Sequence, residues 1–482
     1  MAAWKRSISE SRVRDALKAL PSVEVVDLTR EIDLATVSIP LTKAYRVDGV
    51  HTYIDIVNAD QLLDSDKTES ERSHRRLLRY LHIFQRVLHT AVLSVTDVYR
   101  VDAQNHRTHL ITYKPYDDEA KRVAVAITVA DSLRKLVALA DDLHEELADA
   151  RVRVGIESGV ALAVRNGTRG DRELLFLGNP ANHAAKLLGG TSDGIYLGAV
   201  ARAALGKEFE TKTPSSVVLT ADQISKCVTK SGLTLDLDKM LKQWRDEVKE
   251  NPISDFVFTR PTPPLSDLDV DALSPGASRR IEAAAIMADV DGFTKFVADR
   301  AGTDKAGSAV RALHVIRKEL RDLLQDFGGK KVRYIGDCLQ GVLAEGAATT
   351  DRVKTVSEAL WCVAAMRDAF DIIHAEMPDT KPLGLGIGLE TGPVSITRLG
   401  VKGSRSRCIV GQARVGGLLA RGGEARPRGP GPPPGERGRG VEVAHSMEDP
   451  AARTSRRCRA DRGGDRVVGR PDALEGHVLP AA

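Results

Sequence analysis

Ala288-Asp289-Val290-Asp291-Gly292-Phe293-Thr294 and, further along the chain, Arg333-Tyr334-Ile335-Gly336-Asp337 are the two stretches that decide the fold. Apolar residues before Asp289 predict a short buried strand, and apolar residues on both sides of Gly336-Asp337 predict a β-hairpin. Two such strands lying side by side would place both carboxylates at one end of a sheet. Converging carboxylates without a basic partner are hard oxygen ligands, which suit Mg²⁺ or Mn²⁺. A Gly-Asp pair by itself is commonly only a turn, so the prediction depends on the combination.

These two motifs resemble the catalytic half of the class III nucleotide cyclases. In that family a strand similar to residues 288–296 ("ADVDGFTKF") carries the first metal aspartate, and a Gly-Asp hairpin carries the second. The resemblance implies that Asp289 and Asp337 bind two divalent ions, Mn²⁺ or Mg²⁺, and that Val290 lends its backbone carbonyl. Phe293 is assigned to the substrate-binding residues on the same basis.

Composition describes an ordinary globular protein. The chain has 482 residues, of which 42% are hydrophobic and 28% charged, so it is long enough for two or three domains with cores of their own. A net charge of +4 gives no case for nucleic-acid or membrane binding. The five cysteines are scattered, which argues for a reducing compartment. Since no apolar run approaches the length of a membrane span, we expect a cytoplasmic protein.

The second part of the chain repeats the plan of the first. Asp289 follows Asp55 by 234 residues, and the glycine turn "IGLETG" (387–392) follows "VGIESG" (154–159) by 233. A fixed offset over several landmarks indicates a duplicated domain. We therefore predict an α+β fold of two tandem cyclase-like domains, each with a ferredoxin-like βαββαβ core. Duplicated halves commonly pack about a pseudo-twofold axis with sites between them.

The first half keeps a different part of the expected site. Asn182 and Lys186 are four residues apart on a predicted helix and therefore share one face. Class III cyclases use an Asn-x-x-x-Arg pair there to orient the ribose and stabilise the transition state, so the resemblance implies catalytic roles for both residues. Lys186 can deliver positive charge, but it lacks the bidentate fork of arginine. A solvated helix face is the alternative.

The hairpin of the first half, "YRVDAQNHRTHL" (99–110), lacks the Gly-Asp pair. Asp102 or Asn105 could lie opposite Asp337, depending on the gap. We expect this half to lack a working two-carboxylate site, with Asp55 retained only as a strand-end residue.

Arg333 lies four residues before Asp337, near the place where cyclases carry a base-contacting lysine. Arg333 is therefore our candidate for reading the base, with Tyr334 beside it. An Arg–Tyr pair at this position would be compatible with a pyrimidine base.

We divide the chain into five parts. Residues 1–44 are a lead-in to the first domain, 45–215 a degenerate cyclase-like domain and 216–280 a linker that serves only as a connector. Residues 281–413 form a catalytic domain, and 414–482 form a tail. The tail is rich in arginine, glycine, proline and alanine and contains no aromatic residue, so we expect it to be disordered. The repeat would put a second Asn/Lys pair at 415 and 419, where Val415 and Leu419 stand. A frameshift would produce this pattern, and a nucleic-acid-binding arginine tail is the alternative.

The whole plan resembles the pyrimidine cyclases of bacterial Pycsar antiphage systems. That resemblance implies synthesis of cyclic UMP or CMP from UTP or CTP, usually with Mn²⁺, and a separate effector protein that the product activates. A homodimer is a further possibility. An ordinary adenylate or guanylate cyclase, or a cyclase-like nucleotide-binding regulator without turnover, are the alternatives.

Overall fold

The computed structural model describes residues 4–34, 36–59, 61, 69–96, 98–141, 149–166, 173–213 and 217–411. All of them belong to one compact unit. The predicted tail at 414–482, with positions 415 and 419, lies outside the described residues. None of the helices in the described ranges is both long and apolar enough to cross a membrane.

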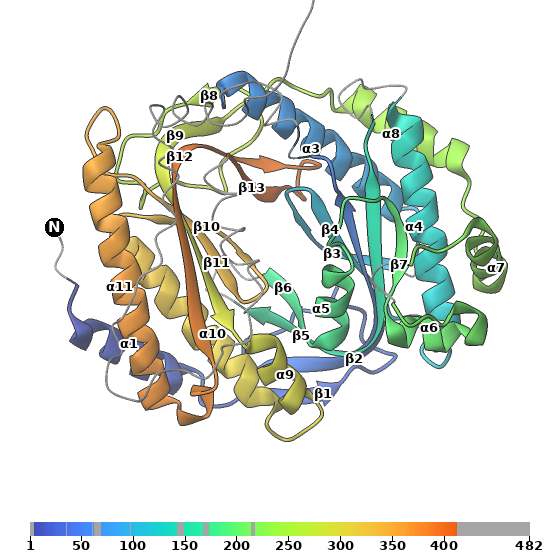
Figure 1. Cartoon of the computed structure of the whole chain (residues 1–482), viewed down its shortest axis with the longest axis horizontal. Coiled ribbons are helices and arrows are strands. Elements are labelled where there is room, and N and C mark those ends of the chain that lie inside the picture. The colour runs from blue at the N-terminus through green and yellow to red at the C-terminus, as the bar shows by residue number, and fades with distance from the viewer. Residues whose placement is uncertain are drawn as a thin grey trace, which may run out of the picture. The chain divides into compact units, whose positions relative to one another are not determined.

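The first half forms a sheet in the order β3-β4-β2-β5-β6, with β1 beside β2 and β7 beside β5. Its core path runs strand–helix–strand–strand–helix–strand, as the sequence predicts (Figure 1). The elements along this half are β1 (Glu24–Asp27), β2 (Lys43–Ile56), α3 (Glu71–Val92), β3 (Val98–Gln104), β4 (Arg107–Thr112), α4 (Glu119–Asp141), β5 (Val152–Asn166), β6 (Glu173–Leu177), α5 (Asn179–Lys186), β7 (Gly194–Leu197) and α6 (Ala199–Leu205).

The second half repeats this order as β10-β11-β9-β12-β13, with β8 beside β9. Strand β9 takes the central place of β2, and the β10–β11 hairpin takes the place of β3–β4. The elements are β8 (Phe258–Thr259), β9 (Ser278–Asp291), α9 (Phe293–Ala301), α10 (Ala306–Asp326), β10 (Lys330–Ile335), β11 (Cys338–Leu343), α11 (Arg352–Glu376), β12 (Gly384–Leu399) and β13 (Ser406–Val410).

Local details repeat as well as the order of strands. The first hairpin has a register shift between Arg100 and Asp102, and the second has one between Lys331 and Arg333. By the register of these hairpins, Asp102 and Arg333 occupy corresponding positions. The two halves thus share strand order, hairpin register and the position of one irregularity.

Each sheet buries one face under its own helices. Along β9, Ala284, Ile286, Ala288 and Val290 pack into the core that α9, α10 and α11 cover. Since neighbouring residues of a strand point to opposite faces, Asp289 is directed to the other face of the sheet. In the first half the even-numbered residues of β2 from Val50 to Ile56 face α3 and α4 in the same way.

The N-terminal helix α1 (Arg6–Ala19) packs on the second half, whereas the sequence suggested a lead-in to the first domain. Arg12 of α1 pairs with Glu319 at 3.0 Å and with Asp326 at 2.7 Å, both on α10. Val13 and Ala16 are buried in the same core as α10 and α11. The amphipathic pattern predicted the helix correctly, but it carries no information about which surface the apolar face covers.

The predicted linker is packed against both halves and is not a bare connector: its helices join the first half, and β8 pairs with β9 of the second. It contains α7 (Ala221–Ser231), which contacts α4, and α8 (Leu237–Glu250), which contacts α3 and α4. Trp244 of α8 is 0% exposed, and its ring lies 5.6 Å from the Arg86 guanidinium. The prolines that follow break regular structure only after this helix has joined the core.

Replacing Trp244 by alanine should therefore lower the free energy of unfolding by about 3–5 kcal/mol, because a large buried ring leaves a cavity. Chemical denaturation followed by circular dichroism measures the change. Trp361 of α11 is the matched control, since it is 63% exposed and its replacement by alanine removes no core contact. Equal effects of the two substitutions would show that α8 is not part of the core.

Candidate active site

Asp289 and Asp337 lie at the same end of the second sheet. The antiparallel pairing of β9 with β11 sets Ala288 opposite Leu339, so one step further Asp289 is level with Cys338. Asp337 occupies the two-residue turn between β10 and β11, because Ile335 pairs with Cys338 across the hairpin. Both aspartates are partly exposed. The register thus brings the carboxylate-bearing positions together as the sequence predicts.

The first half shows what side chains at these two positions do when they meet. Gln104 pairs with Arg107, so Asn105 and His106 form the turn, and His106 corresponds to Asp337. The suggestion that Asp102 or Asn105 lies opposite Asp337 is therefore wrong. Asn105 has a φ of 51° and corresponds to Gly336, which has a φ of 59°. The shared left-handed conformation of the first turn residue supports this alignment.

His106 and Arg107 close the first-half site around Asp55. His106 Nδ1 donates to Asp55 Oδ1, and Arg107 Nε donates to Asp55 Oδ2 at 2.8 Å. Burial of Asp55 by itself would raise the pKa of its carboxyl, but the neighbouring His106 and Arg107 outweigh it and hold that pKa below its usual value. Both oxygens of the Asp55 carboxylate are thus taken up by contacts within the first half.

The same argument tests whether Asp289 and Asp337 fit divalent ions. Asp55 contacts His106, and Asp289 and Asp337 occupy the corresponding positions of the second half. Two carboxylates at such neighbouring positions would be stabilised by a cation between them. No group of three or more histidine, cysteine, aspartate or glutamate side chains that could hold a metal occurs among the described residues. A metal held here therefore takes its remaining ligands from backbone, water or substrate, as Mg²⁺ and Mn²⁺ at phosphate sites do.

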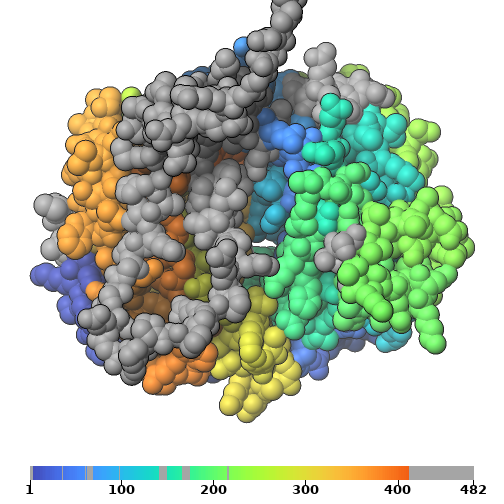
Figure 2. Space-filling view, viewed as in Figure 1, coloured from blue at the N-terminus to red at the C-terminus, as the bar shows by residue number. Residues whose placement is uncertain are grey.

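Asn182 contacts the second half at α9, the helix that follows Asp289. Its Nδ2 donates to Thr294 Oγ1 at 3.0 Å, and Thr294 follows Asp289 by five residues, in the first turn of α9. In Figure 2 the α9 segment (yellow) lies beside the green segment that includes α5. Lys186, one turn further along α5, is exposed. The structure thus brings Asn182 to the helix that follows Asp289, and Lys186 of the same short helix is exposed.

Close backbone contacts with strand β5 fix the position of helix α5. A Cβ at Gly155 of β5 would lie 2.2 Å from the carbonyl oxygen of Ala184, so only glycine allows the helix to approach the strand this closely. Pro180 stands in the first turn of α5, where its missing N–H costs nothing. The predicted "VGIESG" turn is instead part of the continuous strand β5, and its Gly155 lets the helix that carries Asn182 approach that strand.

The Arg333 side chain lies buried at the interface between the two halves. It is 2% exposed, and its guanidinium pairs with Asp102 Oδ2 at 2.9 Å. It also donates to the carbonyl oxygens of Ala103 at 3.2 Å and Arg407 at 2.7 Å. Corresponding positions of the two halves, Asp102 and Arg333, thus contact one another directly.

Tyr334 points to the opposite face of β10 from Arg333, so the two side chains do not act on one base as the sequence suggested. The Tyr334 hydroxyl donates to the backbone carbonyl of Arg317 at 2.9 Å, inside the core under α10. Phe293, assigned to substrate binding, is also a core residue: it is 3% exposed and stacks on Phe296 with ring centroids 6.1 Å apart. Strand alternation by itself predicts that the neighbouring side chains of Arg333 and Tyr334 point to opposite faces of β10.

Further polar contacts join the two halves. His74 Nδ1 of α3 lies 2.7 Å from Ser395 Oγ of β12, and both residues are fully buried. Asn105 Nδ2 donates to the carbonyl of Ile409 at 3.2 Å. Such buried contacts require specific partners, so they fix how the halves meet.

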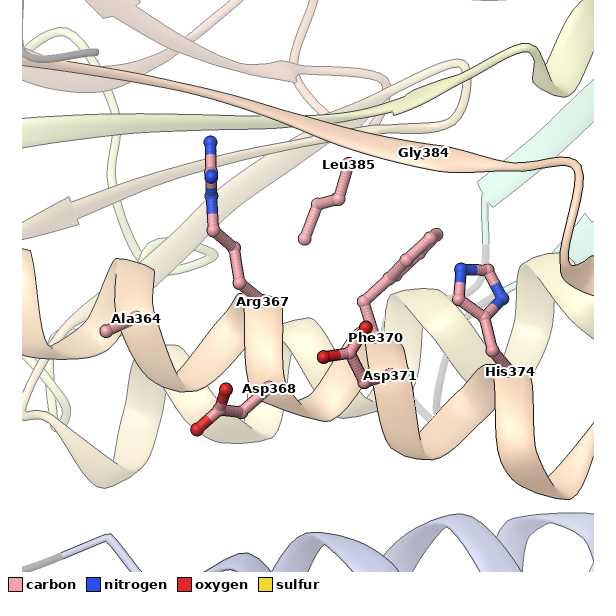
Figure 3. Close-up of a pocket in the computed structure, with 8 residues that line it drawn as sticks. All are labelled: Ala364, Arg367, Asp368, Phe370, Asp371, His374, Gly384 and Leu385. Atoms are coloured by element: carbon pink, nitrogen blue, oxygen red, sulfur yellow. The ribbon is translucent and has the colours of Figure 1, made fainter. Parts of the chain in front are cut away.

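A pocket of about 490 Å³ lies away from these residues, between α11 and the start of β12. Figure 3 shows Arg367, Phe370 and His374 directed from α11 toward the strand, whereas Asp368 is directed away from it. Arg367 corresponds to Arg134 of α4, which pairs with Asp193 just before β7 at 3.0 Å. The pocket is thus the place that β7 fills in the first half, and the counterpart of β7 would fall beyond residue 411, outside the described residues.

Residues 277–413 match the adenylate and guanylate cyclase catalytic domain. The chain is 41% identical over 423 residues to a uridylate cyclase from Pseudomonas aeruginosa, a match that covers 86% of this chain and 81% of the relative. A uridylate cyclase from a Rhizobium species is 36% identical over 397 residues, with coverages of 78% and 75%.

Among solved structures, a class III adenylyl cyclase-like ATP-binding protein from Pseudomonas aeruginosa superposes with a TM-score of 0.81 at 39% identity, covering 86% of this chain and 89% of the other. The fold is that of the class III nucleotide cyclases. The chain belongs to that class, in the family that includes the two uridylate cyclases.

We predict that Asp55→Asn destabilises the protein by about 1–3 kcal/mol at neutral pH, because His106 and Arg107 lose their carboxylate. Since the pKa of Asp55 is lowered by folding, this contribution is complete above the unfolded pKa near 4 and is lost as the pH falls through the folded value. Unfolding measured between pH 7 and pH 2 checks the difference. Asp299→Asn, which removes an exposed pair with Lys295, is the control. A difference that persists unchanged at pH 2 would contradict the ion pair.

We predict that Arg333→Met acts on stability and not on base choice. It leaves Asp102 and two buried carbonyls without their donor, which should cost about 3 kcal/mol. The ratio of kcat/KM between UTP and ATP should stay within about threefold of the wild-type ratio. A tenfold change of this ratio in a variant of unchanged stability would restore the base-reading role.

Proposed function

We propose that the protein is a pyrimidine nucleotide cyclase that converts UTP to 3′,5′-cyclic UMP and pyrophosphate. The observation that carries the proposal is the junction of the two halves, where Asn182 of one half bonds to Thr294, five residues beyond Asp289 of the other. Membership of the class III cyclases supports the reaction type. The names of the two curated relatives support uracil as the base, and CTP is the next substrate to test.

The aspartates would hold the metal and, through it, the triphosphate. In this proposal Asp289 and Asp337 supply carboxylate oxygens from one sheet end, and Val290 lends its backbone carbonyl. Mn²⁺ or Mg²⁺ held there would supply positive charge to the phosphates and lower the pKa of the ribose 3′-hydroxyl. The ribose 3′-oxygen then attacks the α-phosphorus, the proton leaves to solvent, and the bond to pyrophosphate breaks.

The first half would complete the site. Asn182, held beside α9 by Thr294, would accept or donate a hydrogen bond at the ribose. Lys186 is exposed and long enough to bring its ammonium toward the phosphate oxygens as charge develops on them. These roles are positioning and electrostatic stabilisation, and they need no covalent intermediate.

We further propose that the halves are related by a pseudo-twofold axis. Contact between the corresponding residues Asp102 and Arg333 supports it, because equivalent positions meet at such an axis. The proposed site draws on both halves of a single chain, so a homodimer is not needed to complete it. A second-messenger role in antiphage defence, acting through a separate effector, rests only on the sequence resemblance.

A second candidate is nucleotide binding with a purine base. The solved relative with a TM-score of 0.81 is described as an ATP-binding protein. An adenylate cyclase, or a regulator that binds ATP without turnover, would share this fold. Comparing turnover of UTP with turnover of ATP and GTP separates these functions from a uridylate cyclase.

The test is incubation of the purified protein with Mn²⁺ and each of the four nucleoside triphosphates, with pyrophosphate and cyclic nucleotide measured. We expect turnover with UTP to exceed turnover with ATP and GTP. Asp289→Asn and Asp337→Asn should each lower kcat on the order of 10³-fold or more, since each removes a metal ligand.

The first-half variant Asp55→Asn is the matched control, because it removes the corresponding carboxylate from a site already closed by His106. Its kcat at neutral pH should stay near that of the wild type. Equal or better use of ATP would overturn the choice of base. Full activity of either second-half aspartate variant, with unchanged thermal stability, would overturn the metal site.

A further inference from the structure

The turn that carries Asp337 is held from behind by a buried arginine. Arg317 of α10 is 2% exposed, and its guanidinium donates through one terminal nitrogen to the carbonyl oxygen of Gly336. Gly336 is the residue directly before Asp337, and both form the whole turn of the hairpin. A hydrogen bond to this carbonyl therefore fixes the peptide unit from which the Asp337 side chain projects.

Contacts with Tyr334 restrict the position of the Arg317 side chain. The guanidinium carbon lies 4.2 Å from the centroid of the Tyr334 ring, and the Tyr334 hydroxyl donates to the backbone carbonyl of Arg317 at 2.9 Å. Helix α10, strand β10 and the turn are thus joined by contacts that depend on one another. Cation–π contact with a buried ring adds to the hydrogen bonds in restricting the guanidinium.

The first half contains a corresponding contact without the charge. Gln85 of α3 donates through Nε2 to the carbonyl of Asn105 at 2.8 Å. Asn105 corresponds to Gly336, and Gln85 corresponds to Arg317 in its place on the helix behind the hairpin. Both halves hold the carbonyl of the first turn residue from the helix layer, but only the half with two metal carboxylates uses an arginine.

The charges of the two halves differ in the same sense. In the first half, His106 and Arg107 already contact Asp55, and the anchor of the turn is a neutral amide. In the second half both positions are carboxylates, and the anchor is a cation. The Arg317 charge behind the turn stabilises negative charge on the turn that carries Asp337.

We propose that Arg317 is a positioning residue for metal binding, which sets the Asp337 carboxylate by holding the Gly336 carbonyl. This inference rests on the proposed metal role of Asp289 and Asp337. Arg317 contacts the core residue Tyr334 and the Gly336 carbonyl, so its proposed effect on a metal passes through the turn that carries Asp337. Residues that orient metal ligands in this way change metal affinity more than they change substrate binding.

The experiment compares Arg317→Met and Arg317→Gln with wild type by titration of Mn²⁺ alone, followed by electron paramagnetic resonance. In Arg317→Met, which keeps the length but removes donors and charge, the Mn²⁺ dissociation constant should rise about 10–100-fold. In Arg317→Gln, which reproduces the first-half contact, it should rise by less than about tenfold. With Mn²⁺ at saturation, KM for UTP should change little in either variant.

Gln85→Met is the matched control, because it removes the corresponding anchor from the half without metal ligands. It should lower thermal stability in the manner of Arg317→Met but leave the Mn²⁺ dissociation constant at the wild-type value. A folded Arg317→Met variant with wild-type Mn²⁺ affinity would overturn the inference. So would an equal loss of Mn²⁺ affinity in Gln85→Met.

If Arg317→Met fails to fold, Arg317→Gln decides alone: a rise in the Mn²⁺ dissociation constant of about 100-fold would overturn the inference, since the amide is expected to hold the turn. Wild-type protein that binds no Mn²⁺ at all would instead overturn the proposed function. Wild-type protein that binds Mn²⁺ and cyclises UTP, with an unaffected Arg317→Met variant, would overturn only the role of Arg317.

Discussion

The antiparallel ladder between β9 and β11 is the constraint on which the candidate site depends. Because Ala288 pairs with Leu339, the end of β9 and the turn of the hairpin meet at one edge of the sheet, and Asp289 and Asp337 meet with them. A slip of one residue would direct Asp289 into the helix-covered core. The register is held by the apolar residues that alternate with Asp289 and pack under α10 and α11. Core packing on one face thus positions the polar residues on the other.

The two halves show that this geometry alone does not make a metal site. They share strand order, hairpin register and the left-handed turn residue, yet His106 and Arg107 stand where the other half has Asp337 and Cys338. With Arg107 there, Asp55 forms an ion pair within the protein. The second half instead has carboxylates at the positions of both Asp55 and His106, and the proposed metal site rests on that difference.

The contact between the halves is polar and specific, which suits a site shared by both. Arg333 with Asp102, His74 with Ser395 and Asn182 with Thr294 each link one half to the other. Buried polar groups lose more by mispairing than apolar groups do, so such contacts restrict the halves to one arrangement. Two outer helices support this arrangement: α1 packs against α10, and α8 packs against α3. Neither helix carries a residue of the candidate site. Asn182 can thus be held beside the strand of Asp289, which lies more than 100 residues away in the sequence.

The sequence by itself determined the class of fold, the duplication, the strand that carries Asp289, the hairpin that carries Asp337 and the helix that carries Asn182. These features are local: they follow from alternation, helical spacing, glycine turns and a constant offset, all of which are visible along one chain. Tertiary structure decided what each polar side chain faces. It assigned Arg333 to Asp102 and Tyr334 to the core, made His106 the counterpart of Asp337, and packed α1 and α8 where no pattern indicated. The physical reason is that a periodic pattern shows which residues are buried, whereas the partner of a buried charge is fixed only when distant segments come into contact.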